Sequence, residues 1–194
     1  TAEPCRYGGI MGWLAYQTGD WNRAISMLAK SVDACPDDAG RWNLLGLALV
    51  RKQEMPAALE AFDQALILAP AHPALLNNRA LAYAYSGKSG TALSDLEKAA
   101  AIAPDNSGII ANLAVMRANS GLDAPLANGQ DPQMQALILE KAGEGASAAA
   151  RYDSARSYFA EALLRSERFD PSLWARATQE HPEKQQELMN ARGD

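Results

Sequence analysis

A period of 34 residues constrains this chain more than any other feature of its sequence. Small residues and prolines recur at this spacing, without insertion, from residue 5 to residue 106. The recurring positions are Gly12, Gly46 and Ala80; Ala24, Ala58 and Ala92; and Pro36, Pro70 and Pro104. A fixed period of about 20 to 50 residues is typical of arrays in which one supersecondary unit stacks on the next. The sequence therefore predicts an array of repeated units.

The segment from residue 41 to residue 70 shows the pattern most completely. Its marked positions are, in order, Trp42, Leu45, Gly46, Ala58, Phe62, Ala65 and Pro70. In this order and spacing the chain resembles the tetratricopeptide repeat family over residues 5–106, and more loosely to about residue 166. The resemblance implies two antiparallel helices, A and B, in each repeat. It predicts an all-α fold in which helical hairpins stack into a right-handed superhelix with a C-terminal capping helix region.

Turn residues predict where the helices of the first three repeats end. Proline lacks a backbone N–H and disfavours helix in the residue before it, so Pro36, Pro70 and Pro104 close helix B of each repeat. The expected helices span residues 5–18, 21–34, 39–52, 55–68, 73–86 and 89–102.

The period fails in the fourth repeat. Pro125, Gly129 and Pro132 interrupt the helix B that this repeat needs, so we predict a loop there. Ala155 and Phe159 then restore the helix-B spacing. The predicted divisions are residues 1–121, with three repeats and the first helix of a degenerate fourth; 122–131, an irregular linker; 132–166, a divergent hairpin; and 167–194, a C-terminal cap.

Composition argues against several classes of partner. The chain has 194 residues, of which 48% are hydrophobic, and a formal net charge of −5. We expect no nucleic-acid partner, because binding to phosphates requires a basic face. No apolar run approaches the roughly 18 residues of a membrane span, so no transmembrane segment is expected.

No constellation of side chains points to catalysis. His72 and His181 are the two histidines, and they lie in different predicted turns beside prolines. A zinc site or a Cys–His nucleophile needs ligands that converge in space. The sequence also has no Gly-rich phosphate loop, and its acidic residues are scattered. We therefore expect no enzymatic activity, no cofactor and no metal.

The two cysteines, Cys5 and Cys35, stand at the start of the first predicted helix and just after the second. These ends meet in an antiparallel hairpin, so the two residues can lie at disulfide distance. Two interpretations remain open: a disulfide in an oxidising compartment, or two reduced cysteines in a cytosol. The first favours a bacterial periplasmic or envelope-associated protein, and the second a cytoplasmic one.

The family resemblance also implies a binding surface. In stacked tetratricopeptide repeats helix A lines the concave inner wall, and its wall positions can be transferred to this sequence residue by residue. The candidate peptide-binding residues are Trp13, Tyr16, Gln17, Asn43, Leu47, Arg51, Asn77, Asn78, Leu81, Tyr85, Asn112 and Asn119. Asparagine amides can bond both the N–H and the C=O of an extended peptide, and aromatic residues anchor interfaces. The alternative is that asparagine is merely tolerated there and that Trp13 packs in the core.

Some tetratricopeptide repeat domains clamp the C-terminal carboxylate of chaperones with a set of Lys, Asn and Arg side chains. The corresponding positions here include Gly9, Trp13, Leu44 and Asn78. The lysine and most of the asparagines of that set are therefore missing, and we expect no clamp of this type.

Residues 76–104, with the Ala-Asn-Leu-Ala segment at 111–114, are similar to the TadD family of bacterial tight-adherence pilus assembly. This resemblance implies a non-enzymatic scaffold that binds a partner peptide or helix on its concave face, in pilus, secretion or envelope assembly. Two alternatives stay open. One is a structural module that assembles with copies of itself through the repeat ends, and the other is a regulatory domain of a larger protein.

Overall fold

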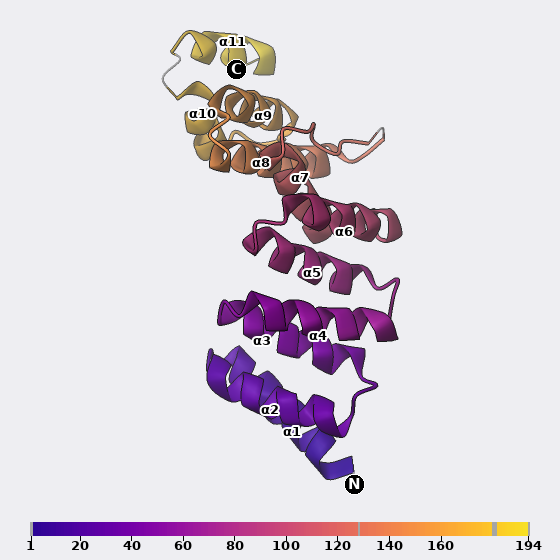
Figure 1. The fold of residues 1–194 in the computed structure, drawn as a ribbon. Coiled ribbons are helices and arrows are strands. Elements are labelled where there is room, and N and C mark those ends of the chain that lie inside the picture. The colour runs from indigo at the N-terminus through magenta and orange to yellow at the C-terminus, as the bar shows by residue number, and fades with distance from the viewer. Residues whose placement is uncertain (1, 128, 180–181, 194) are drawn as a thin grey trace. The chain divides into compact units, whose positions relative to one another are not determined.

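The protein is described by a computed structural model that covers residues 2–127, 129–179 and 182–193, without the side chains of residues 2–5 and 182–184. These residues form eleven helices and no strand (Figure 1). The chain divides into two compact units, residues 1–103 and 104–194. The prediction of an all-α fold built from helical hairpins is confirmed.

Unit 1 contains three consecutive hairpins. Its helices are α1 (Ala2–Gln17), α2 (Trp21–Ala34), α3 (Ala39–Arg51), α4 (Met55–Leu68), α5 (Pro73–Tyr85) and α6 (Ser89–Ile102). Their bounds agree closely with those expected from the period, although α1 begins earlier than predicted. Aspartates start two of the helices, because the side chain of Asp20 accepts a hydrogen bond from the Arg23 amide and Asp38 accepts one from the Arg41 amide.

The recurring glycines bring the two helices of a hairpin together. A Cβ atom at Gly46 on α3 would lie 2.6 Å from the ring of Phe62 on α4. A Cβ at Gly12 on α1 would lie 2.5 Å from Leu28 on α2. Phe62 and Leu28 are fully buried, so each fills the space that the missing side chain leaves.

A partly buried ion-pair network joins the second and third hairpins of unit 1. Arg79 on α5 donates from Nε and Nη2 to the two carboxylate oxygens of Asp95 on α6, at 2.7 and 2.9 Å. Its Nη1 donates to Asp63 on α4 at 2.7 Å. Asp95 is almost completely buried, and the hydrogen bond from Arg79 satisfies its charge while raising the pKa of the Arg79 guanidinium.

Unit 2 is less regular. Its helices are α7 (Ser107–Asn119), α8 (Pro132–Ala148), α9 (Tyr152–Arg165), α10 (Pro171–Thr178) and α11 (Pro182–Arg192). The described residues between α7 and α8 contain no helix. Because helix B of the fourth repeat is absent, α8 packs directly on α7. The contact is close, since a Cβ at Gly145 would lie 2.2 Å from the carbonyl oxygen of Val115.

Two arginines connect α10 and α11 to the rest of unit 2. Arg176 on α10 pairs with Glu140 on α8 at 2.7 Å and lies 4.5 Å from the ring centre of Phe159 on α9. Arg192 on α11 donates to the carbonyl oxygen of Leu163 at 2.7 Å, at the end of α9.

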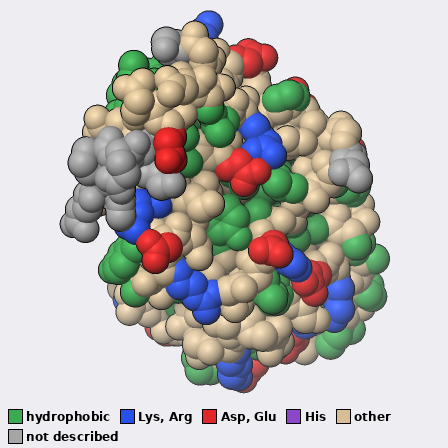
Figure 2. Space-filling view, turned by 90° about the horizontal axis from the view of Figure 1, so that it is seen from above, with side chains coloured by type: hydrophobic (Ala, Val, Ile, Leu, Met, Phe, Trp, Pro, Cys, Tyr) green, Lys and Arg blue, Asp and Glu red, His purple; other side chains and the backbone are tan. Residues whose placement is uncertain are grey.

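Figure 2 shows basic and acidic side chains scattered among apolar ones on the face seen from above. No helix of the described chain is long and apolar enough to cross a bilayer.

Candidate functional site

Unit 1 has an apolar groove between α1 and the start of α3, with a volume of about 420 Å³. Its lining residues are Arg6, Gly9, Ile10 and Trp13 of α1, Leu28 of α2, and Asp38, Gly40, Arg41 and Leu44 in or just before α3. One of them, Trp13, is a wall position of helix A that the family resemblance assigns to the first repeat. The structure therefore places Trp13 in a groove, half exposed, and not in the core.

Two features shape this groove. Gly9 keeps it open, because a Cβ there would lie 2.9 Å from Nε of Arg41. Arg41 is held by an ion pair with Asp38 at 3.0 Å, in the first turn of α3. The groove thus combines an apolar floor at Leu28 and Leu44 with polar groups at its edge.

The asparagines of α3 and α5 form a chain of side-chain hydrogen bonds. Nδ2 of Asn78 donates to Oδ1 of Asn43 at 2.8 Å, and Nδ2 of Asn77 donates to Oδ1 of Asn78 at 3.3 Å. The sequence predicts these amides as binding groups for a peptide, and the hydrogen bonds between them are visible only in the structure. Each amide has two donors and about two acceptor sites, so Asn43 and Asn78 retain hydrogen-bonding capacity for a ligand.

The remaining candidates of unit 1 lie apart from the groove lining. Tyr16 packs edge-on against Trp21, with ring centres 5.3 Å apart, and Arg51 lies 5.8 Å from the Trp21 ring. Leu47 packs against the apolar core. Of the other three, Gln17 and Tyr85 are exposed and Leu81 is half-buried. Trp21 was missed because it belongs to helix B, outside the wall positions.

Asn112 and Asn119 belong to unit 2. Both lie on α7, where Asn112 is half-buried and Asn119 is exposed at the end of the helix.

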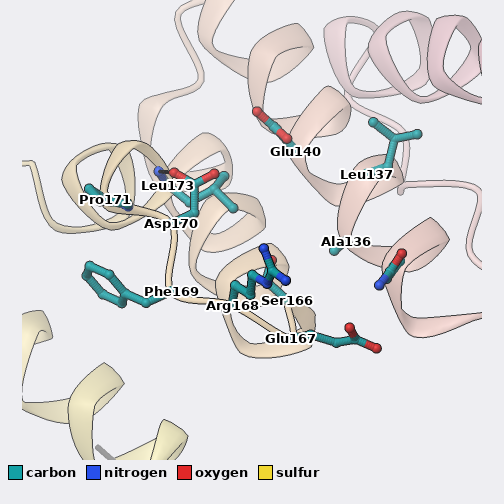
Figure 3. Close-up of a pocket in the computed structure, with 11 residues that line it drawn as sticks. Ala136, Leu137, Glu140, Ser166, Glu167, Arg168, Phe169, Asp170, Pro171 and Leu173 are labelled. Carbon is teal, nitrogen blue, oxygen red and sulfur yellow. Dashed lines mark hydrogen bonds between the residues drawn. The ribbon is translucent and has the colours of Figure 1, made fainter.

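Unit 2 has a larger groove, of about 710 Å³, that the sequence analysis did not predict. Figure 3 shows Ala136, Leu137 and Glu140 on α8, facing the segment before α10. The full lining is Gln133, Ala136, Leu137, Glu140, Ser166, Glu167, Arg168, Phe169, Asp170, Pro171 and Leu173. It lies where one helix A meets the start of the next, as does the groove of unit 1.

A spacing in the sequence reveals this equivalence. Gly12 and Leu28 are 16 residues apart, as are Gly143 and Phe159. A Cβ at Gly143 would lie 2.4 Å from the Phe159 ring, so the second pair repeats the glycine contact of the first. Alignment of Gly143 with Gly12 places Glu140 at the position of Gly9.

Among the titratable groups that line the unit 2 groove, Asp170 has a clearly lowered pKa. Its carboxylate accepts hydrogen bonds from the amides of Ser172 and Leu173, at 2.7 and 3.2 Å. The pKa of Asp170 is lowered first by a hydrogen bond from the Ser172 side chain, and then by those from the Leu173 and Ser172 amides. Asp170 thus caps α10 as an anion. Among the residues that the structure describes, no group of three acidic, histidine or cysteine side chains is placed to bind a metal.

The expected disulfide falls partly outside the described residues. Cys35 caps the end of α2 and is half-buried, but the side chain of Cys5 lies outside the described part of the structure. The pairing of Cys5 with Cys35 therefore stays a prediction.

Comparison with known proteins places these helices among related sequences. Tetratricopeptide repeat family models match residues 11–73 and residues 44–118. Sperm-associated antigen 1 of Mus musculus is 33% identical over 92 residues, which is 47% of this chain and 10% of that protein. The heat-shock protein cognate co-chaperone sgt12 of Aspergillus fumigatus is 38% identical over 72 residues, or 37% of this chain and 21% of that protein.

Solved structures share the fold at low sequence identity. A structure from a functional study of pilF of Pseudomonas aeruginosa aligns with 98% of this chain and 89% of its own, with a TM-score of 0.62 and 17% identity. The first repeat domain of Spaghetti (RPAP3), bound to the HSP90 peptide SRMEEVD, aligns with 60% of this chain and 92% of its own, with a TM-score of 0.57 and 19% identity. Over residues 11–118, more than half of its length, the chain belongs to the tetratricopeptide repeat family.

Proposed function

We propose that this protein is a non-enzymatic scaffold that binds a segment of a partner protein along the A-helix face of unit 1. The observation that carries the proposal is the groove beside Trp13. Half of that indole is exposed above an apolar floor, although burial of so large a ring is strongly favourable. An apolar side chain of a partner would cover it.

The neighbouring polar groups favour a segment with exposed backbone. Amides of Asn43 and Asn78 stand on the next two A helices, and each retains hydrogen-bonding capacity after the bond between them. Arg6 and Arg41 stand at the edge of the groove. We infer an extended peptide, or the end of a helix, with one bulky apolar residue and an acidic residue near it.

The relatives support segment binding of this general kind. RPAP3 is described with a bound HSP90 peptide, and sgt12 is named as a co-chaperone. The chain spans about a fifth or less of the curated relatives it matches, so their activities enter only as candidates. Since the lysine of the carboxylate clamp is missing here, we propose a partner other than a chaperone tail.

For the pathway, we propose pilus, secretion or envelope assembly in a bacterium, with the protein in the periplasm or at the envelope. The similarity of residues 76–104 to TadD-type scaffolds motivates this proposal. The fold that the chain shares with pilF is compatible with it, but at 17% identity that likeness concerns the fold alone.

Affinity capture from a bacterial envelope extract tests the groove. The baits are the wild-type chain, Trp13→Ala, the double variant Asn43→Ala/Asn78→Ala, and the control Ile67→Ala on the exposed side of α4. We expect the wild type and the control to retain the same protein, and both groove variants to lose it. Equal capture by all four baits would place the binding surface elsewhere.

A second measurement separates the chaperone-tail alternative. Fluorescence anisotropy with labelled SRMEEVD should give no saturable binding to the wild-type chain. Saturable binding that Trp13→Ala abolishes would keep the groove as the site but would make the partner a chaperone tail.

A further inference from the structure

The groove of unit 2 contains more acidic than basic side chains. Its lining includes Glu140, Glu167 and Asp170, and its one basic residue is Arg168. The charged residues that line the groove of unit 1 are instead two arginines and one aspartate. The two grooves occupy the same place, between one helix A and the start of the next. Their difference in charge therefore indicates that they suit different ligands.

One substitution changes the wall that α8 contributes. Gly9 leaves the equivalent wall of unit 1 uncharged, whereas Glu140 places a carboxylate at that position. Arg176 on α10 pairs with Glu140 at 2.7 Å and offsets its charge. This wall is therefore polar, and the excess negative charge of the groove comes from the opposite side.

Asp170 supplies that excess charge, on the side of the groove that faces Glu140 (Figure 3). It is equivalent to Asp38, because each of the two aspartates caps the helix A that follows its groove. In unit 1 Asp38 pairs with Arg41, three residues further along the chain. The residue three after Asp170 is Leu173, which is apolar and buried. Asp170 thus lacks the partner that Asp38 has, and the amides of α10 keep it ionised.

The two remaining charges of the lining nearly cancel. Glu167 and Arg168 are neighbours in the segment before α10, and both are exposed. Neither forms an ion pair with another residue of the described chain. Because the pair of Glu140 and Arg176 is also neutral as a whole, the carboxylate of Asp170 leaves the groove with a net negative charge. A ligand that complements this charge is a cation.

The groove also offers apolar surface to a ligand. Ala136 and Leu173 are buried at its base, Leu137 is half-buried, and Pro171 is exposed. The volume of about 710 Å³ holds several side chains. An inorganic cation would leave this apolar surface uncovered, so the ligand carries apolar groups beside its charge. Lysine and arginine have this character themselves, because an apolar stem carries the charged head.

We propose that the groove of unit 2 binds a basic segment of a partner protein, in which a lysine or arginine stands next to a bulky apolar residue. The charged head lies beside Asp170, and the apolar side chain covers Leu137 and Pro171. This site is separate from the groove of unit 1, which suits a segment with an acidic residue. The two grooves thus select segments of opposite charge.

Selection from a phage library of random peptides, with the full 194-residue chain as the bait, tests this second site. Enriched peptides are synthesised, and fluorescence anisotropy measures their dissociation constants. We expect one enriched class to have a lysine or arginine next to a bulky apolar residue. Asp170→Asn keeps an oxygen for the amides of α10 but removes the charge, so it should weaken the binding of this class at least about threefold. Arg168→Glu replaces a repulsive charge by an attractive one and should strengthen the binding at least about threefold.

Two variants of unit 1 are the controls. Asp38→Asn makes the same substitution at the equivalent cap, and Trp13→Ala removes the indole from the groove of unit 1, so neither should change the affinity of the basic class. Circular dichroism verifies that every variant is folded. The proposal is overturned if no basic, apolar class is enriched, if Asp170→Asn and Arg168→Glu leave its binding unchanged, or if Asp38→Asn weakens it as much as Asp170→Asn does. Enrichment only of peptides that depend on Trp13 would support the groove of unit 1 and overturn the second site.

Discussion

Units 1 and 2 differ in how regularly their helices alternate. In unit 1 every helix A is followed by a helix B within a few residues, and the register holds over three hairpins. In unit 2 a loop replaces helix B after α7, and α8 packs directly on α7. Within unit 2 the glycine contact reappears between Gly143 and Phe159. The pairing of a glycine with a large apolar residue is thus retained where the 34-residue period is lost.

The close contact of α7 with α8 gives the largest expected effect. Gly145→Ala should destabilise unit 2 by about 2 kcal/mol or more, because the new Cβ meets backbone of Val115 that must shift. Urea unfolding followed by circular dichroism measures the change.

Gly90→Ala on α6 is the matched control, since no atom lies within 4 Å of a Cβ built there. Alanine is the better helix former, so this variant should be more stable by about 0.5–1 kcal/mol. A loss of stability as large as that of Gly145→Ala would mean that the Val115 contact is not the cause.

The ion pairs of the two units should differ in strength. Asp95→Asn in unit 1 leaves Arg79 without its nearly buried partner, and we expect a loss of about 2 kcal/mol. In unit 2 Glu140→Gln breaks the half-exposed pair with Arg176 and should cost less than about 1 kcal/mol. The free energy of unfolding of each variant, from urea titration, tests the ranking, and equal losses would contradict it.

The smallest expected effect concerns acid. Hydrogen bonds to the start of α10 lower the pKa of Asp170. The ionised carboxylate therefore stabilises α10 above the ordinary aspartate pKa of about 3.9, and this stabilisation is lost as pH falls through the lowered pKa. The protection factors of the Ser172 and Leu173 amides against hydrogen exchange should therefore fall in that acid range. In Asp170→Asn this acid-dependent part should disappear, and the Ile109 amide, capped by the neutral side chain of Asn106, serves as the control.

Most of the fold could be predicted because it follows from local rules. The period located the helices of unit 1, and aspartate or proline at a helix start gave α8 and α10 their first residues. The chain of amides from Asn77 through Asn78 to Asn43 could not be predicted in the same way. It joins residues 35 apart, and its formation depends on how closely two A helices stack.

The wall positions of helix A include Trp13, and in the structure Trp13 lines a groove. That the wall residues bind a peptide stays a prediction. The groove of unit 2 was missed, since the loss of one helix shifts the register there. The signal that finds it is the 16-residue spacing of Gly143 and Phe159, which is independent of the 34-residue period.

Site-specific photo-cross-linking from position 13 tests whether a partner protein binds in the groove of unit 1. Trp13 is replaced by p-benzoylphenylalanine, with the same replacement of Ile67 as the control, and each chain is irradiated in bacterial envelope extract. We expect one protein to be cross-linked from position 13 and not from position 67, and a peptide from the cross-linked segment to prevent this cross-link by competition. The same products from both positions, or none from position 13, would contradict a binding groove at the A-helix face of unit 1.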